Sequence, residues 1–489
     1  MNLLTDAWLP VDDGHTRRRV SLRDVLCSDS AFTVSTPRDD FDAAVVTLSA
    51  ALVQSLFPDL EDEELVERER TPLTREDFSR RASAQCDYFD LFHARHPFMQ
   101  TRSVAAEIKN AGMIVPGAPG ASSHLLGFRA TSSPRRFCDS CVTLALYVRA
   151  TMSPSFGGGY CGTIRGGAPI DFHVRGPHLR EAIWRNVISG PTRRSLIVDD
   201  ARVNDLPTWV SPIPNGVPVK AETIGLVRGL LWQPAVIELH PDTHTGTCDL
   251  CGVEDVYTVS RYRALKFKVI VDGLFPHPRG AQRYYKSQET GTYELSFTSY
   301  TDSSPVWGLM SRWSASADAE ARLAQEPPVV TQFRRIWPDR PIEVAAVGYV
   351  TKQAKIEQRR AETVVLAQGK LAFEAANAAS SVRDAVFGAV VAIGRDVKLK
   401  SPSRLASRAA LQLSQWVDGD VRQAISTGLA VDERFATRLR GAAMRCFEDA
   451  VDIVGRDART SQAVSLGRVR LRTALASLLG SSLPKEINS

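Results

Sequence analysis

Two pairs of cysteines have the spacing of a metal site. Cys138 and Cys141 form one C-x-x-C pair, and Cys248 and Cys251 form a second pair much further along the chain. Four thiolates in two short chelating pairs give a tetrahedral sulfur site, which suits zinc and leaves no position open for water. We therefore predict a structural zinc ion on these four residues, joining segments that are distant in the sequence.

A second ligand set competes with the first. His240 and His244 precede Cys248 and Cys251 in an H-x3-H-x3-C-x2-C arrangement, which would leave the first cysteine pair free. Both alternatives stay open at this level. Disulfides are not expected, because eight cysteines in so long a chain are too few for a disulfide scaffold.

A glycine-rich segment follows the first cysteine pair. Residues 155–167 read Ser-Phe-Gly-Gly-Gly-Tyr-Cys-Gly-Thr-Ile-Arg-Gly-Gly and contain six glycines. Backbone without Cβ atoms lets a phosphate, a sugar or a base edge approach within contact distance. The segment has neither the Walker A ending nor the G-x-G-x-x-G spacing. On composition alone, a glycine-rich surface turn is the alternative.

We find no pattern that predicts catalysis. None of the nine histidines lies in an H-E-x-x-H motif, and the chain has no G-x-S-x-G elbow. His277, between two prolines, is expected to be a turn residue. Basic and aromatic residues interleave in 261–268 and in 279–286, which suits either phosphate contacts with ring stacking or plain strands with alternating faces.

Length and composition set the class of protein. A chain of 489 residues exceeds the size at which one core stops growing, so two or more domains are expected. The net charge of +5 permits nucleic-acid binding through local patches without requiring it. No apolar run approaches the ~20 residues that a membrane span needs, and Asp6 interrupts any signal-peptide core. We therefore expect a cytoplasmic protein.

The elements that must position these residues mix helices and strands. We expect strands at 7–11 and 169–174 and helices at 41–57 and 142–152, without a βαβ rhythm, so the pattern favours an α+β fold. The acidic run 61–64 is read as a solvated face or a helix N-terminus. A long loop without periodicity, rich in Gly, Pro, Ala and Ser, is expected at 109–136.

The last third of the chain is expected to be helical. Only Pro402 and Pro484 of the 27 prolines follow Pro341, and apolar residues then recur at helical spacing. A further helix at about 362–398 completes a predicted four-helix bundle. The apolar stripes contain Trp416 and Cys446, and the latter is read as a buried free thiol.

Several separated segments of the chain form one further pattern. They are residues 2–11, 138–141, 156–159 with 164–169, 207–209, 225–239, 248–251, 276–278, and Gly348-Tyr349 followed by Lys352-Gln353. Together these segments resemble one family, the large subunit (CasA family) of the type I-E CRISPR surveillance complex Cascade. They lie in family order over nearly the whole chain and are highly specific together.

The resemblance implies a non-enzymatic subunit with an α+β body at 1–365, containing the zinc site, and a C-terminal four-helix bundle at 366–489. In that family the body checks the protospacer-adjacent motif (PAM) from the minor-groove side and helps to start R-loop formation. The implied partners are the small, backbone and 5′-handle-binding subunits, the guide RNA 5′ handle, double-stranded target DNA and the helicase-nuclease, with no membrane.

The resemblance also assigns DNA-contacting residues. It places a glycine loop at Gly157, Gly158, Gly159, Tyr160 and Gly162, and a glutamine wedge at Gln353 in a β-hairpin over 344–365, a stretch that composition alone allows to be helical. Lys286 is the first choice for the family's lysine finger and Lys268 the second, because the stretch after Pro278 departs from the family pattern. Lys352 stands where a smaller polar residue is common and could add a phosphate contact.

Two other classes of function remain as alternatives. A metal-dependent nuclease would need a carboxylate or histidine cluster, which the sequence does not display. A general RNA-binding scaffold with a structural zinc would bind nucleic acid without preferring PAM-containing duplexes.

Overall fold

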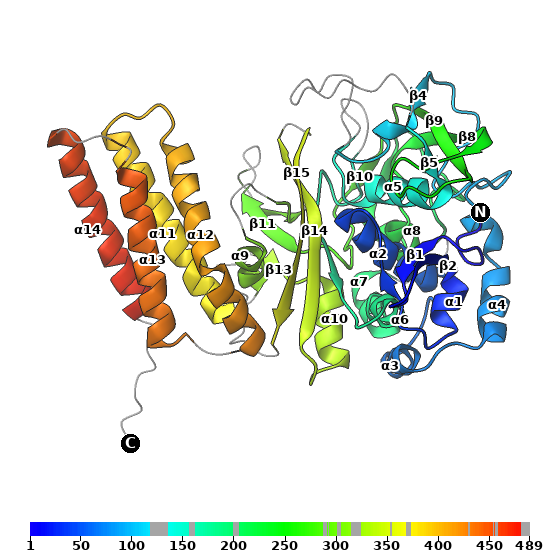
Figure 1. Ribbon diagram of the computed structural model, residues 1–489, viewed down its shortest axis with the longest axis horizontal. Coiled ribbons are helices and arrows are strands. Elements are labelled where there is room, and N and C mark those ends of the chain that lie inside the picture. Colours follow the sequence, from blue (N-terminus) through cyan, green and yellow to red (C-terminus); the bar gives the residue numbers. More distant parts are fainter. Residues whose placement is uncertain are drawn as a thin grey trace. The chain divides into compact units, whose positions relative to one another are not determined.

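The structure is a computed structural model in which two compact units are distinguished (Figure 1). The first unit comprises Met1–Tyr300, Glu326–Trp337 and Val344–Glu362, and the second comprises Thr301–Gln325, Pro338–Glu343 and Thr363–Ser489. The structure describes residues 1–117, 135–155, 162–198, 205–286, 291, 293–300, 305–313, 324–352, 355–367, 373–428, 431–452, 454 and 458–480.

A buried helix, α2 (Asp39–Leu56), lies at the centre of the first unit. Acidic residues in the first turn of α2 interact favourably with the positive end of the helix dipole, and Pro58 lies just after the helix ends. Nearly all of its side chains are buried, and it packs against α5 (Asp139–Thr151), α6 (Leu179–Arg185) and α8 (Leu226–Leu230). The helix predicted at 41–57 is confirmed.

Two small sheets carry the segments around the cysteines. The first has the order β2-β1-β3, from β1 (Leu9–Asp12), β2 (Arg17–Val20) and β3 (Thr33–Val34). In the second, β9 (Val256–Leu265) pairs with three antiparallel neighbours: β4 (Ile108–Asn110), β5 (Phe137–Cys138) and β8 (Val236–Gly246). Because β5 runs directly into α5, that helix begins at Asp139, earlier than predicted, with Cys141 in its first turn.

A third sheet, of order β15-β14-β6, contains the hairpin that the family resemblance implied. Strands β14 (Ile342–Lys352) and β15 (Lys355–Leu366) are neighbours, and β14 also pairs with β6 (Asp171–Val174). The predicted helix at 362–398 is wrong at its start, because the chain stays in β15 to Leu366 and α11 begins at Glu374. Pairing with β14 overrides the weak local preference of this stretch.

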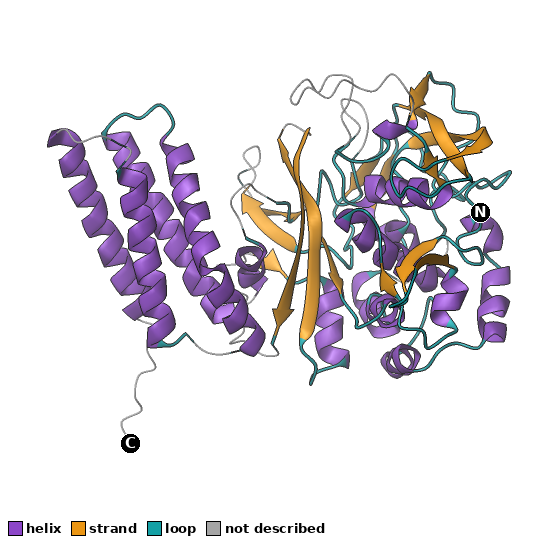
Figure 2. Ribbon diagram, in the orientation of Figure 1, coloured by secondary structure: helices purple, strands orange, loops and turns teal. Residues whose placement is uncertain are grey.

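The other elements of the first unit fill the space around these sheets (Figure 2). The acidic run at 61–64 forms the N-terminus of a helix, α3 (Asp62–Arg70), as predicted. The remaining elements of this unit are α1 (Leu22–Leu26), α3 (Asp62–Arg70), α4 (Arg75–Ser83), α7 (Gly190–Leu196), α10 (Pro328–Ile336), β7 (Pro218–Lys220), β10 (Ile270–Asp272), β11 (Gln282–Lys286) and β12 (Tyr293–Phe297).

Four long helices run side by side in the second unit (Figure 1). They are α11 (Glu374–Asp396), α12 (Pro402–Thr427), α13 (Glu433–Val451) and α14 (Ala458–Gly480), and α9 (Val306–Met310) and β13 (Ala324–Gln325) accompany them. Pro402 begins α12, and Gly428 ends it with a φ of +66°. The predicted four-helix bundle is confirmed.

Two predicted positions in the bundle differ in outcome. Cys446 is fully buried, as expected of a thiol on an apolar stripe. Trp416 is 45% exposed, and the Arg445 guanidinium lies 5.6 Å from its ring centroid. The apolar stripe of α12 therefore ends short of this residue, because helical spacing alone does not fix how wide the buried face is. Among the described residues, no helix is long and apolar enough to span a membrane.

Close packing in the first unit can be tested at Gly229 in α8. A Cβ atom there would overlap the ring of Phe275, which is fully buried. We expect Gly229→Ala to lower the free energy of unfolding by about 1–3 kcal/mol, because the buried ring or the helix must shift to make room for the added methyl group. Thermal and urea unfolding measure this change.

Gly441 in α13 provides the matched control, because a Cβ atom there meets no atom within 4 Å. Gly441→Ala should raise stability by about 0.5–1 kcal/mol through helix propensity. Equal effects of the two substitutions would contradict the packing described here.

Candidate metal centre and nucleic-acid interface

The four cysteines of the two C-x-x-C pairs come together in the first unit. Their sulfur atoms all lie within 4.8 Å of one another, and the group could hold a metal ion. The Sγ atoms of Cys138 and Cys251 are 3.7 Å apart. In a tetrahedral site with metal–sulfur bonds of about 2.3 Å, neighbouring sulfurs lie about 3.8 Å apart, so the spacing fits a metal and is too long for a disulfide.

Secondary structure explains why these residues meet. Cys138 ends β5 and Cys141 lies in the first turn of α5, whereas Cys248 and Cys251 lie in the connection between β8 and β9. The strands β5 and β9 are paired, with Cys138 opposite Thr258. The Asp249 amide donates to the Arg136 carbonyl, and the Arg136 amide donates to the Asp249 carboxylate, so these two hydrogen bonds join the segments that carry the two cysteine pairs.

The mixed histidine–cysteine set is not brought together. His240 lies on β8 opposite Arg261 of β9, and His244 is exposed further along the same strand. Among the described residues, the group with metal-ligand geometry consists of the four cysteines alone.

Arg19 of β2 contacts the cysteine group, which sequence reasoning did not anticipate. Its Nη2 atom donates to Cys138 Sγ at 2.9 Å and to Cys251 Sγ at 3.4 Å. Hydrogen bonds with Cys138 lower the pKa of Cys248 and Cys251 and raise that of Cys141. A guanidinium here offsets part of the negative charge of a tetrathiolate site. No spacing rule in the sequence connects Arg19 to residues so far away.

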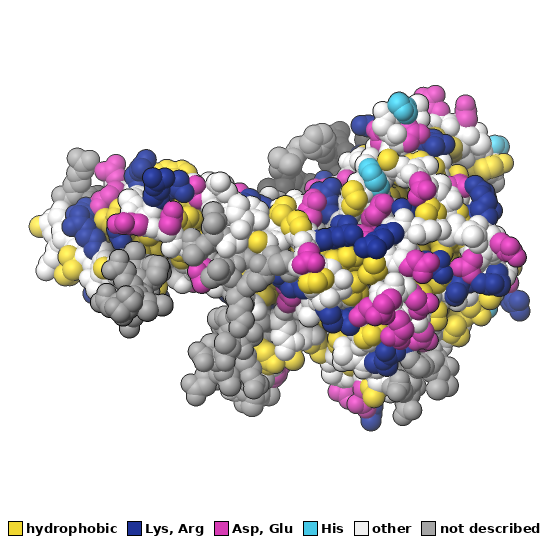
Figure 3. All heavy atoms as spheres, turned by 90° about the horizontal axis from the view of Figure 1, so that it is seen from below, with side chains coloured by type: hydrophobic (Ala, Val, Ile, Leu, Met, Phe, Trp, Pro, Cys, Tyr) yellow, Lys and Arg dark blue, Asp and Glu magenta, His cyan; other side chains and the backbone are white. Residues whose placement is uncertain are grey.

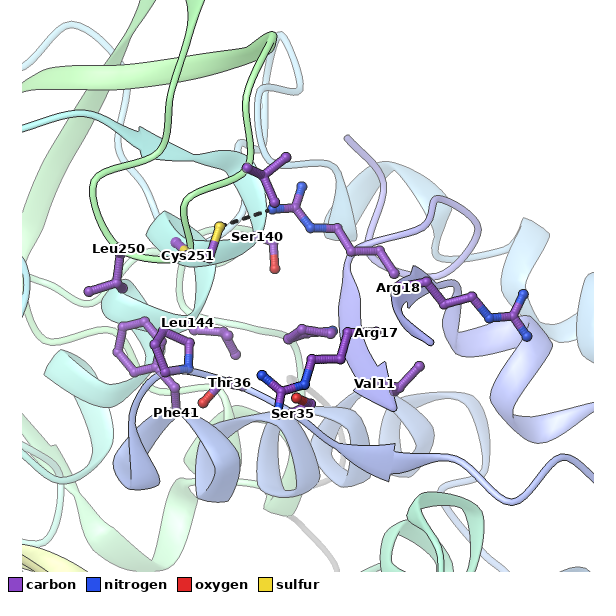
Figure 4. A pocket seen from close by; sticks show the side chains of 15 residues that line it. Val11, Arg17, Arg18, Ser35, Thr36, Phe41, Ser140, Leu144, Leu250 and Cys251 are labelled. Atoms are coloured by element: carbon purple, nitrogen blue, oxygen red, sulfur yellow. Dashed lines mark hydrogen bonds between the residues drawn. The ribbon is translucent and has the colours of Figure 1, made fainter. Parts of the chain in front are cut away.

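A pocket of about 500 Å³ lies beside the cysteine group (Figure 4). Cys141 and Cys251 line it, so two of the four ligands border a cavity rather than packed protein. Figure 4 shows Arg17, Ser35 and Thr36 on one side of this pocket, with Arg18 directed away from it.

The predicted DNA-contacting residues are only partly described. Gly157, Gly158, Gly159, Tyr160 and Gln353 lie outside the described residues. The side chain of Lys286, at the end of β11, also lies outside them, whereas Gly162, Lys268 and Lys352 are described. The side chains of Lys268 and Lys352 are exposed. Their roles stay predictions.

A second pocket, of about 350 Å³, joins both ends of the glycine segment to the hairpin. Pro154 directly precedes the segment 155–167 and Ser155 begins it, residues 162–167 form its end, and Thr351 is next to the last residue of β14. The pocket is lined by Pro154, Ser155, Gly162, Thr163, Gly166, Gly167 and Thr351. Two segments that the family resemblance linked to DNA thus border one cavity.

A buried ion cluster includes one residue of the turn that borders this second pocket. Asp171 of β6 accepts hydrogen bonds from Arg165 Nη2 at 2.7 Å and from Arg279 Nε at 3.2 Å, and all three side chains are at most 1% exposed. Arg165 also donates to the carbonyl of Thr151, the last residue of α5, and Arg279 donates to Tyr147 Oη. The cluster joins α5, the glycine-segment turn, β6 and the segment before β11.

Electrostatics in this cluster keep the carboxylate charged. Burial opposes the charge of Asp171, but Arg279 and Arg165 lower its pKa below the usual value. Burial, together with the same two arginines, lowers the pKa of His277 well below its usual value, so this histidine is neutral. His277 is a buried residue whose Nδ1 accepts from the Arg279 amide at 3.2 Å, rather than only a turn residue between prolines.

The basic and aromatic stretch at 261–268 behaves as a strand over its first part. In β9, Tyr262 and Ala264 are buried while Arg261 and Leu265 are exposed. On the face shown in Figure 3, the described basic and acidic side chains are interspersed rather than gathered in one patch. Any contact with nucleic acid on that face would therefore be local.

Comparison with known proteins connects this architecture to a family. The model of the family "CRISPR-associated protein Cse1" matches residues 2–401. The fold is similar to that of Thermus thermophilus CasA (Cse1), with 17% identity, a TM-score of 0.70, and 98% and 99% of the two chains covered. Thermobifida fusca Cse1 gives 18% identity and a TM-score of 0.70, with 98% of both chains covered.

A third similar chain belongs to a structure described as a CRISPR RNA-guided surveillance complex, with 15% identity, a TM-score of 0.65, and 96% and 99% coverage. Fold and site together define an α+β protein with a four-cysteine centre and a helical bundle. The chain belongs to the CRISPR-associated protein Cse1 family. The resemblance to the CasA family is thereby confirmed.

The cysteine centre predicts a defined metal content. We expect one tightly held metal ion per chain, lost in Cys138→Ser and in Cys248→Ser because each removes one of four ligands. Elemental analysis after gel filtration measures the content. His244→Ala is the control and should retain the metal; loss in the histidine variant with retention in Cys138→Ser would select the mixed site instead.

The buried ion cluster predicts a large stability effect. Asp171→Asn should lower the free energy of unfolding by about 3–5 kcal/mol, because two buried guanidinium groups lose their counter-charge. Since the folded pKa of Asp171 is lowered, its contribution is complete above about pH 4 and is lost as the pH falls through the folded value. Denaturant unfolding between pH 2 and pH 7 should therefore show that the free energy of unfolding falls less steeply at acid pH in the variant than in wild type.

Asp384→Asn is the control for this experiment. Its ion pair with Arg383 is at the surface, with the Asp384 side chain 64% exposed, so the change should be below about 1 kcal/mol. A cost for Asp171→Asn no larger than this would show that the cluster does not hold the four segments together.

Proposed function

We propose that this chain is the non-catalytic large subunit of a type I-E CRISPR RNA-guided surveillance complex, and that it reads the PAM in double-stranded target DNA. It then helps to start R-loop formation and to recruit the helicase-nuclease. The observation that carries the proposal is the second pocket, where the ends of the glycine segment and the end of β14 border one cavity.

The chemistry of this region suits a minor groove. The pocket offers peptide groups and hydroxyl side chains, and the exposed Lys352 follows Thr351 directly. A minor groove presents a degenerate hydrogen-bond pattern, so a reader of it depends on close backbone approach and on a residue that unstacks a base step. The glycine loop at 157–162 supplies the first feature, and Gln353, between β14 and β15, supplies the second.

The remaining partners follow from the same proposal. The chain would contact the small, backbone and 5′-handle-binding subunits and the guide RNA 5′ handle, and guide pairing would supply sequence discrimination. The bundle serves as a docking surface, supported by Leu466 and Val469 of α14, which are 48% and 61% exposed. Lys286, with Lys268 as second choice, supplies the lysine finger.

We further propose that the metal is zinc and that its role is structural. Cys138, Cys141, Cys248 and Cys251 would hold it, and a four-sulfur site gives zinc no open position for chemistry. The zinc would fix the start of α5 against the β8–β9 connection. Cleavage of DNA by the purified chain alone would overturn the non-catalytic role and revive the nuclease alternative. Equal binding of all duplexes by the assembled chain would favour the general RNA-binding scaffold.

The proposal predicts distinct effects for two neighbouring residues. Gln353→Ala should leave folding and assembly intact but slow R-loop formation on linear duplex by about tenfold, because unstacking the first step costs a few kcal/mol. Negatively supercoiled or pre-opened targets should be affected less, since unwinding is already favoured. R-loop kinetics on matched linear, supercoiled and bubbled targets test this.

Lys352→Ala is the comparison variant. It removes an exposed charge and should weaken binding to all duplexes, with a shallower salt dependence. Equal slowing of Gln353→Ala on all three targets would leave Gln353 as an ordinary surface residue.

A further inference from the structure

The four cysteines of the metal centre are not equally shielded. Cys138, Cys141 and Cys248 are at most 4% exposed, whereas Cys251 is half-buried. Cys141 and Cys251 line the pocket of about 500 Å³, and the lining that the described residues form includes neither Cys138 nor Cys248. Cys251 is therefore the ligand that a molecule in this pocket reaches most directly.

This pocket offers a path to the half-buried thiol. Leu250 and Val253, close to Cys251 in the sequence, line it, and Phe41 of α2 and Leu144 of α5 form another part of its wall (Figure 4). A volume of about 500 Å³ is large enough to admit a small chelating molecule. A metal site needs an entry path for its ion, and this pocket leads to one side of the cysteine group.

Arg19 holds the half-buried thiol in place. Its Nη2 atom donates to Cys251 and to Cys138, which belong to different C-x-x-C pairs, and the contact with Cys251 is the dashed line in Figure 4. Hydrogen bonds from a cation withdraw part of the negative charge of thiolates that share a divalent ion. Loss of such a partner typically weakens metal binding by about tenfold or more. Arg19 thus opposes displacement of Cys251.

We propose that the metal ion enters and leaves the centre through this pocket, with Cys251 as the ligand that exchanges and Arg19 as the residue that restrains the exchange. In this step a donor atom of an incoming ligand forms a bond to the metal while the bond from Cys251 Sγ breaks, and no electron is transferred. The inference rests on the proposed zinc centre. It adds a direction of exchange and a positioning residue to the four ligands.

The test follows metal transfer from the metal-loaded, full-length chain to excess pyridylazoresorcinol, a chelator that changes colour on binding zinc. Arg19→Met keeps the aliphatic stem and removes both hydrogen bonds, so transfer should be faster than in wild type by about tenfold or more. Arg19→Lys keeps the charge but has one nitrogen in place of the guanidinium, so its rate should lie between the two.

Arg17→Met is the matched control. Arg17 lies on the same strand and lines the same pocket, but its ion pair is with Asp12, at 3.6 Å. The substitution removes the same charge, and its transfer rate should stay within about twofold of wild type. Equal acceleration in Arg17→Met and Arg19→Met would reveal a general charge effect and overturn the role of Arg19.

Trapping with iodoacetamide during transfer identifies the ligand that exchanges. Peptide mass spectrometry of the wild-type chain should find Cys251 alkylated faster than Cys138 and Cys248 by about fivefold or more. Val253→Trp adds bulk to the pocket wall and should slow both transfer and alkylation by about threefold. Val217→Trp is its control, because Val217 is 53% exposed and lies outside the lining.

The outcomes separate this inference from the proposed zinc. A wild-type chain that holds no metal would overturn both. A wild-type chain that holds its metal, but in which Cys251 is alkylated no faster than the other ligands, would overturn the route and leave the zinc centre standing. Wild-type transfer rates in Arg19→Met would overturn the restraint. If Arg19→Met lowers the melting temperature of the metal-loaded chain, Arg19→Lys decides in its place, with faster transfer supporting the inference and equal transfer opposing it.

Discussion

The first unit depends on one buried carboxylate shared by two guanidinium groups. Asp171 is fully buried and is balanced by Arg165 and Arg279, which come from distant parts of the chain. Burying a charge without its partner costs several kcal/mol, so the three side chains must be buried together. Their backbones, and hence the glycine-segment turn, β6 and the segment before β11, are held in one arrangement.

Helix α5 connects this cluster to the cysteine centre. Cys141 lies in its first turn, Tyr147 in its middle accepts from Arg279, and the carbonyl of Thr151 at its end accepts from Arg165. A metal on the four cysteines would fix one end of a short, buried helix whose other end is fixed by the ion cluster. Such a metal would thus be connected to the ion cluster through a single buried helix.

The buried elements and the segments at the pocket differ in their structural roles. Buried strands and α5 supply fixed positions, while the described ends of the glycine segment and Thr351 near the end of β14 border the second pocket. Functional groups are commonly carried on loops held by a rigid scaffold. The bundle has its own apolar core and presents exposed apolar side chains on α14, which suits docking rather than chemistry.

The sequence by itself determined the elements whose signals are local. The C-x-x-C pairs, the buried α2 helix, the bundle and the family resemblance depend on residue spacing over short stretches, and each was predicted. The tertiary structure decided which ligand set forms, because pairing of β5 with β9 and of β8 with β9 brings four cysteines together and keeps His240 on a strand. It also decided that 355–366 is a strand, and it revealed Arg19, the Asp171 cluster and Thr351. These contacts join residues far apart in the chain, and no pattern within one segment records which distant partner will neutralise a charge or border a cavity.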